Sequence, residues 1–166
     1  MATTLKSNPS LPPHFSDSRY TIGIVTSVWN KQITDALKNG AISTLKQFKQ
    51  IQSLEIKQCS VPGVFEIATC AQWFFENGCD AVVNLGCVIQ GETPHFDFIC
   101  KSAADSISQL ALKYSKPCIF GVLTTKNFAQ ALERAGGSLG NKGSEAAEAA
   151  LWMLMRKDEL LKGKNS

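Results

Sequence analysis

An apolar run, Ala81–Ile89, sets the architecture that this chain can adopt. The run is apolar almost throughout and does not alternate strictly with polar residues, which favours a parallel strand covered on both faces. A strand of this kind belongs in the middle of a sheet. The run therefore predicts the central strand of a parallel β-sheet, and the glycine-containing loop after it predicts a turn at the strand's carboxyl end.

The loop after this strand combines four residues that suit an anion site. Gly91 lets the backbone turn tightly and approach a ligand closely. Thr93 and Pro94 precede a helical pattern, where amides are unpaired, a hydroxyl can cap the helix and phosphate is a usual guest. His95 would then lie beside the anion and could move protons. Taken singly, these residues fit a plain strand-to-helix turn with a surface histidine; their combination at a strand's carboxyl end favours a ligand site.

Strands and helices alternate along the whole chain. The expected strands cover about residues 20–28, 53–59, 81–89 and 117–124, and helices are expected after each of them, with a last helix at about 144–157. This order predicts right-handed crossovers with helices on both sides of the sheet. The fold class is therefore α/β, a flavodoxin-like three-layer αβα sandwich with a four-stranded parallel sheet. The more polar strand at 53–59 is expected at an edge.

Individual residues mark the helix ends. Asn30 and Asn127 each precede an apolar helical pattern and are expected to cap it with their side chains. Gly78 follows the helix expected over residues 65–77 and is expected to close it.

Length and composition predict one globular domain. Of 166 residues, 44% are hydrophobic and 19% charged, which suffices for a sizeable core. We expect this domain over residues 18–160, between a flexible N-terminal tail at 1–17 and a C-terminal tail at 161–166. The 17 basic and 14 acidic residues give a net charge of +3. That excess is too mild to favour nucleic acid or membrane partners, and no stretch reaches the roughly 18 apolar residues of a membrane span.

The cysteines and histidines exclude two further classes of protein. The six cysteines lie mostly in apolar runs and form no C-x-x-C pair, so we expect small buried hydrophobes in a reducing cytoplasm rather than disulfides. With only His14 and His95, a zinc site is not expected.

Parallel strands end at the same edge of a sheet, so residues 29–30, 61–66, 86–95 and 124–125 should converge. Trp29 would offer a flat face for stacking on a planar heterocycle, although a core tryptophan near a strand end is equally compatible. The backbone of residues 63–65 and the Glu66 carboxylate could bind a polyol chain. Alternatively, Glu66 only favours the dipole of the helix that it precedes.

Arg134–Gly143 is rich in glycine and resembles a phosphate loop, but Asn-Lys-Gly does not match the Gly-Lys-Ser/Thr ending of a P-loop. The stretch instead predicts a helix-to-helix turn that carries Arg134 and Lys142. Two cations there could serve a single phosphate. From these residues alone, solvated charge beside a glycine turn is the preferred interpretation.

Five motifs, in order and at matching intervals, resemble the lumazine synthase family. They are Trp29-Asn30, Val61–Ile67 (VPGVFEI), Gly91–Asp97 (GETPHFD), Gly121–Thr125 (GVLTT) and Glu133–Gly136 with Gly140–Gly143. The resemblance covers nearly everything after the N-terminal tail. It implies a transferase of riboflavin biosynthesis that condenses 5-amino-6-(D-ribitylamino)uracil with 3,4-dihydroxy-2-butanone 4-phosphate to give 6,7-dimethyl-8-ribityllumazine. It also implies that no metal or organic cofactor is needed.

The same resemblance implies the roles of single residues. The pyrimidine and the ribityl chain would be bound by Trp29, Asn30, Val64, Phe65, Glu66, Val88, Ile89, Phe120 and Lys142. The phosphate would be bound by Glu92, Thr93 and Arg134, and His95 would transfer protons. Phe120, Arg134 and Lys142 would enter the site from a neighbouring subunit, so one subunit would be an incomplete enzyme.

The resemblance further implies a homo-oligomer, either a pentamer or an icosahedral shell of sixty subunits, with an enclosed riboflavin synthase as a candidate partner. The short turn at Gly136–Gly143 favours the shell. Phenylalanine is commoner than tryptophan at position 29 in this family, and the hypothesis follows that Trp29 also stacks on riboflavin. The alternative function is a riboflavin- or lumazine-binding shell protein with reduced catalysis.

Overall fold

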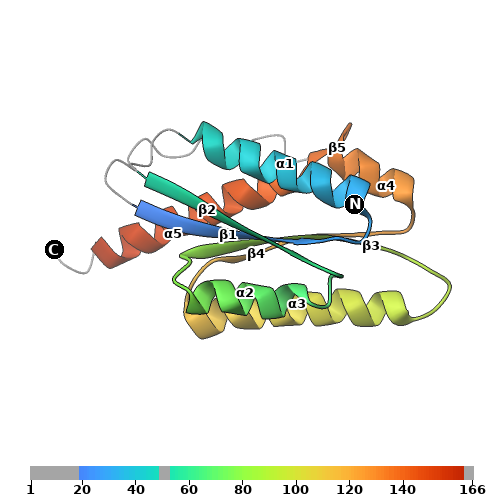
Figure 1. Ribbon diagram of the computed structural model, residues 1–166, viewed down its shortest axis with the longest axis horizontal. Coiled ribbons are helices and arrows are strands. Elements are labelled where there is room, and N and C mark those ends of the chain that lie inside the picture. The colour runs from blue at the N-terminus through green and yellow to red at the C-terminus, as the bar shows by residue number, and fades with distance from the viewer. Residues whose placement is uncertain (1–18, 49–52, 163–166) are drawn as a thin grey trace.

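The computed structural model describes residues 19–48 and 53–162 (Figure 1). In chain order the elements are β1 Arg19–Ser27, α1 Lys31–Gln47, β2 Ser53–Val61, α2 Ile67–Glu76, β3 Ala81–Ile89, α3 His95–Tyr114, β4 Cys118–Thr125, α4 Phe128–Arg134, β5 Ala135–Gly137, β6 Gly140–Asn141 and α5 Lys142–Lys162. The tail predicted for residues 1–17 lies outside the described residues. So do residues 163–166 of the predicted C-terminal tail.

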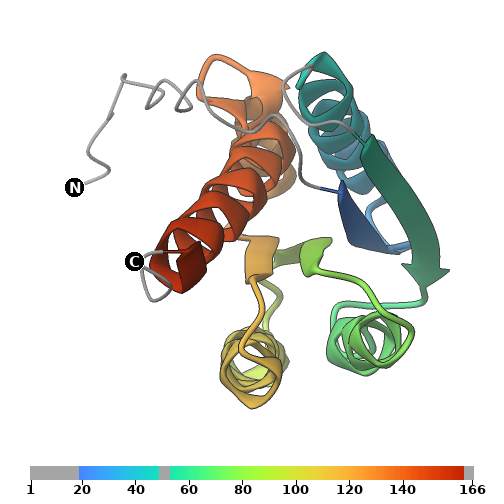
Figure 2. The ribbon, with the colours of Figure 1, turned by 90° about the vertical axis from the view of Figure 1, so that its left-hand side faces the viewer.

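Four strands form one parallel sheet in the order β2-β1-β3-β4. Helices α2 and α3 cover one face, and α1, α4 and α5 lie on the other, so the domain has three layers (Figures 1 and 2). The predicted flavodoxin-like α/β fold is confirmed, and β2 lies at an edge as expected. The connections reverse direction between β1 and β3, and open α/β sheets bind ligands at strand ends beside such a switch point.

Two apolar cores, one on each face of the sheet, stabilise these layers. Ile24 of β1 packs with Leu37 and Leu151 on the α1 and α5 side. Val25, the next residue of β1, packs with Ile67 and other residues on the α2 and α3 side. Burial of one such side chain contributes about 1.5–3 kcal/mol. Because both faces are covered, β3 is buried from Ala81 to Cys87, which explains its lack of alternation.

Two of the three predicted helix-end residues behave as expected. The Asn127 side chain caps α4, since its Oδ1 accepts from the Gln130 N–H at 2.9 Å, and Gly78 follows α2 with a left-handed φ of 87°. The prediction for Asn30 is wrong: its side chain makes no cap. Instead, Asn30 adopts a left-handed conformation and its Nδ2 donates to the Cys87 carbonyl at 2.9 Å. The Asn30 side chain thus contacts a residue distant in sequence instead of capping its own helix.

The segment after α4 also differs from the prediction. Instead of a simple helix-to-helix turn, it forms the short antiparallel hairpin β5–β6. The hairpin is held by the Glu133 carboxylate, which accepts from the Ser138 N–H at 2.9 Å. Helix α5 begins at Lys142 rather than Ser144, because the Asn141 Oδ1 accepts from the Gly143 and Ser144 amides and caps it there. It continues to Lys162 rather than Lys157.

All six cysteines are free thiols, and four of them are buried as predicted: Cys70, Cys79, Cys87 and Cys118. Cys59 and Cys100 are half-buried. Across residues 19–48 and 53–162, no helix combines the length and the apolar character needed to cross a membrane.

Candidate active site

The ends of β1 and β2 stay paired beyond the regular strands. The Val28 N–H donates to the Val61 carbonyl at 2.8 Å, and the Trp29 N–H donates to the Pro62 carbonyl at 3.2 Å. This pairing lays the segment after β1 alongside the loop that leads into α2. The predicted convergence of these two strand ends is therefore confirmed.

The Trp29 indole lies over Gly63 in that loop. A Cβ added at Gly63 would come within 2.5 Å of the indole Cζ3 and 3.1 Å of the Glu66 carboxylate. Trp29 is 65% exposed, so the alternative of a core tryptophan is wrong, and Phe65 is 60% exposed. The Glu66 Oε2 accepts from the Gly63 N–H at 2.9 Å. The loop thus presents two open aromatic faces beside a fixed carboxylate, a suitable setting for a planar ring with polar substituents.

Asn30 and Val64 connect this loop to β3. The Asn30 side chain donates to the Cys87 carbonyl, and Val64 packs against Gly86, where an added Cβ would lie 2.7 Å from the valine Cγ2. Val64 is buried, whereas Val88 and Ile89 at the end of β3 are half-buried. Burial raises the pKa of the Cys87 thiol to about 11, so this thiol is protonated at neutral pH and is no nucleophile.

The loop between β3 and α3 is open to solvent. Glu92, Thr93 and His95 are all exposed. Pro94 occupies the N-cap position of α3, which has no side-chain cap, so the expected capping by the Thr93 hydroxyl is wrong. In the described part of the chain, the His95 N–H finds no backbone acceptor, while the Asp97 N–H reaches the Pro94 carbonyl at 3.0 Å. An uncapped helix start with open amides suits an anion.

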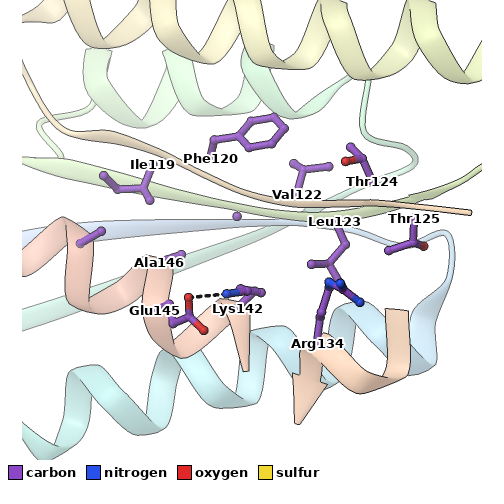
Figure 3. A pocket seen from close by; sticks show the side chains of 12 residues that line it. Ile119, Phe120, Val122, Leu123, Thr124, Thr125, Arg134, Lys142, Glu145 and Ala146 are labelled. Carbon is purple, nitrogen blue, oxygen red and sulfur yellow. Dashed lines mark hydrogen bonds and ion pairs between the residues drawn. The ribbon is translucent and has the colours of Figure 1, made fainter. Parts of the chain in front are cut away.

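Three of the predicted site residues lie elsewhere, in an open groove along the outer edge of β4. This β4 groove has a volume of about 400 Å³ and is lined by β4, Arg134 and the first turns of α5. Phe120 is 41% exposed on one side of the strand, and Arg134 and Lys142 lie on the other (Figure 3). The Lys142 Nζ pairs with Glu145 at 2.7 Å. Arg134 donates to the Gln130 carbonyl at 3.0 Å and pairs with no carboxylate within the described residues.

The predicted site residues thus form two groups within one chain. Among the described residues, the lining of the β4 groove includes neither Trp29 nor His95. The two regions are joined by the pairing of β3 with β4, in which Val88 and Ile89 lie opposite Thr124 and Thr125. Beyond this ladder, the Gln90 N–H donates to the Thr125 carbonyl at 2.8 Å. The second group lies along the sheet edge, because among the described strands β4 has a neighbour on one side only.

Sequence reasoning assigned no role to two residues of the groove, although it expected residues 124–125 at this edge of the sheet. Glu145 follows Lys142 at the i, i+3 spacing of helical ion pairs. This spacing would have indicated the pair if the start of α5 had been predicted at Lys142 rather than Ser144. Thr125 is buried, and its hydroxyl has no hydrogen-bond partner. Nothing in the sequence pattern distinguishes it from Thr124. Across the described residues there is no cluster of three or more potential metal ligands.

Known proteins of similar sequence indicate the family of this chain. The sequence model described as 6,7-dimethyl-8-ribityllumazine synthase matches residues 19–158. A protein of that name from Cytophaga hutchinsonii is 51% identical over 138 residues, covering 82% of this chain and 86% of the relative. One from Bdellovibrio bacteriovorus is 50% identical, covering 80% and 73%, and one from Phocaeicola vulgatus is 43% identical, covering 90% and 88%. The chain belongs to the 6,7-dimethyl-8-ribityllumazine synthase family.

Proposed function

We propose that the protein is a 6,7-dimethyl-8-ribityllumazine synthase, a transferase that acts in the penultimate step of riboflavin biosynthesis. Its substrates are 5-amino-6-(D-ribitylamino)uracil and 3,4-dihydroxy-2-butanone 4-phosphate. The observation that carries the proposal is the family match over residues 19–158. That match includes both groups of candidate site residues, at the strand ends and in the β4 groove.

The first substrate binds at the joined ends of β1, β2 and β3. The exposed Trp29 indole stacks on the pyrimidine ring, supported from below by Gly63. The loop backbone at Val64 and Phe65 holds the ribityl chain, and the fixed Glu66 carboxylate accepts from ligand hydroxyl or amine groups. The neighbouring wall is formed by Asn30, Val88 and Ile89. From a neighbouring subunit, Phe120 and Lys142 close the pocket.

The second substrate carries a phosphate, for which two features of the fold are suited. The loop that contains Glu92 and Thr93 offers the open amides at the start of α3. Arg134 of a neighbouring subunit adds a guanidinium that has no carboxylate partner among the described residues. His95, in the first turn of α3, lies beside that anion.

These residues would promote the condensation of the two substrates. The uracil amine attacks the butanone carbonyl, and the carbinolamine loses water to form an imine. Phosphate is then eliminated, the ribityl nitrogen closes the ring, and a second water leaves. Proton transfer by His95 contributes roughly 10² to 10⁴ in rate. The two reactants are inclined to condense, so holding them in register contributes the larger part.

The site is shared between copies of the chain, so the active form is a homo-oligomer. We infer a pentamer as the unit and a sixty-subunit icosahedral shell as the assembly, which the short β5–β6 hairpin supports. Light scattering on the purified protein should return a particle of shell size, and a discrete pentamer would rule out the shell. We also infer a cytoplasmic location, which the six free thiols support.

A spectrophotometric assay for lumazine formation with both substrates tests the proposed activity. The exposed Trp29 favours a second candidate, a riboflavin- or lumazine-binding shell protein with reduced catalysis. No turnover together with quenching of Trp29 fluorescence by riboflavin would favour this second function. Turnover at a rate above the uncatalysed condensation would support the synthase.

A further inference from the structure

Three hydroxyl groups of the described residues are buried and have no hydrogen-bond partner: those of Thr26, Ser27 and Thr125. Thr26 and Ser27 are the last residues of β1, and Thr125 is the last residue of β4. A buried hydroxyl without a partner destabilises the folded state. All three lie where open α/β sheets bind ligands, at the carboxyl ends of parallel strands.

Thr125 differs from the other two because it also lines the β4 groove. It is only 5% exposed. Leu123, two residues earlier, packs in the core on the α1 and α5 side, and alternate strand residues share a face. The Thr125 side chain therefore lies on the same side of the sheet as Leu123 and Arg134 (Figure 3). Its carbonyl accepts from the Gln90 N–H at 2.8 Å, which fixes this strand end to the loop before α3.

Two potential donors of this part of the groove, Arg134 and Thr125, have no carboxylate partner among the described residues. Lys142 is already paired with Glu145 at 2.7 Å. The Arg134 guanidinium has no carboxylate partner within the described residues, and the Thr125 hydroxyl has no partner at all. A guanidinium and a neutral hydroxyl donor on one side of a cavity suit an anion with several acceptor oxygens. A hydrogen bond from the hydroxyl would orient the anion, and it would not add to the charge of the site.

We propose that Thr125 is a further phosphate-binding residue, whose Oγ1–H donates to an oxygen of the phosphate ester that Arg134 binds. This inference rests on the proposed function, because that function supplies the phosphorylated substrate. Thr125 fixes the orientation of the ester relative to Arg134. Without ligand, the unpaired hydroxyl destabilises the folded protein, and its hydrogen bond to the bound ester removes this penalty.

The test compares Thr125→Val, which keeps the shape and removes the hydroxyl, with Thr125→Ser, which keeps the hydroxyl. Thr26→Val is a matched control, since it removes another buried unpaired hydroxyl outside the groove. Three quantities are measured on the assembled protein: the Kd of inorganic phosphate by calorimetry, the KM of each substrate, and Tm.

We expect Thr125→Val to weaken phosphate binding roughly 10- to 100-fold, as expected for loss of a hydrogen bond to a charged group. The KM of the phosphorylated ketone should rise by a similar factor, while the KM of the uracil stays unchanged. Thr125→Ser should remain within about threefold of the parent protein because it keeps the donor. Both valine variants should keep or raise Tm, because each loses an unpaired buried hydroxyl.

Phosphate binding by Thr125→Val that equals binding by Thr26→Val would overturn the inference. An equal rise in both KM values together with a lower Tm would also overturn it, because that pattern indicates a packing role. The calorimetric result does not depend on turnover. If the parent protein makes no lumazine but binds phosphate through Thr125, the proposed function fails and the inference stands; if it makes lumazine and Thr125→Val behaves normally, only the inference fails.

Discussion

At the scale of single residues, His95 and Arg134 carry different parts of the proposed reaction. His95 moves protons, so His95→Ala should lower kcat by roughly 10² to 10⁴ without abolishing turnover, because the substrates are still held in register. Arg134→Ala should mainly raise the KM of the phosphorylated ketone, and Arg134→Lys should recover little, since it loses the bidentate fork. Steady-state measurements of kcat and KM for the three variants test these expectations. An inactive His95→Ala beside a normal Arg134→Ala would contradict this division of roles.

Gly63 controls the position of the Trp29 ring. An alanine Cβ there would lie 2.5 Å from the indole Cζ3, so the ring must move away from the loop. Gly63→Ala should therefore raise the KM of the uracil about tenfold or more, equivalent to the loss of one aromatic stack of about 1.5 kcal/mol. The KM of the ketone should change little.

The double variant Gly63→Ala with Trp29→Phe is the matched control, because the smaller ring leaves space for the added methyl group. It should recover much of the lost affinity for the uracil. If Gly63→Ala alone left that KM unchanged, the indole would not be the stacking surface.

At the scale of elements, the strands were predicted best. The apolar run at Ala81–Ile89 coincides with β3, since burial on both faces demands an apolar residue at nearly every position. The absence of a side-chain cap at Asn30 could not be predicted, because the side chain instead bonds to Cys87, which is distant in sequence. The β5–β6 hairpin has too few residues for an alternating pattern to appear.

In the candidate site, too, features set by the local sequence pattern could be predicted and features set by tertiary structure could not. The meeting of Trp29 with the loop at Gly63–Glu66 could be predicted, because parallel strands end at one edge. The separation of Phe120, Arg134 and Lys142 from that loop was expected only from the family resemblance. The residue pattern alone could not give it, because it depends on strand order, which is a property of the whole fold.

The contact between α1 and α5 gives a prediction at this scale. A Cβ at Gly143 would lie 1.9 Å from the Leu37 carbonyl oxygen, so the two helices approach through their backbones. Gly143→Ala must push them apart and should lower the free energy of unfolding by about 3 kcal/mol, at the upper end of overpacking effects. Denaturant titration at one protomer concentration measures this. Gly91→Ala is the control, since its Cβ would meet nothing within 4 Å. Equal midpoints for the two variants would contradict the close helix contact.

At the scale of the whole molecule, the single chain leaves large apolar side chains uncovered. Phe98 and Leu112 of α3 are 71% and 79% exposed, and no strand from residues 19–48 or 53–162 pairs with the outer edge of β4. Soluble monomers rarely leave extended apolar surface and an open sheet edge together. With the division of the site residues into two groups, these surfaces support the proposed assembly of several chains.

An active site shared between subunits predicts complementation between two damaged chains. His95→Ala subunits keep Arg134, and Arg134→Ala subunits keep His95. In rings assembled from an equal mixture, about a quarter of the shared sites receive both intact residues, because each neighbour is drawn at random. At a concentration of the phosphorylated ketone well below its KM for Arg134→Ala, co-expressed variants should therefore regain about a quarter of the parent activity, far above the sum of the separately purified variants. Mixing the two after assembly, without exchange of subunits, is the control and should give only that sum. If co-assembled hybrids also gave only the sum, His95 and Arg134 would have to act within one chain, and the β4 groove would not complete a neighbour's site.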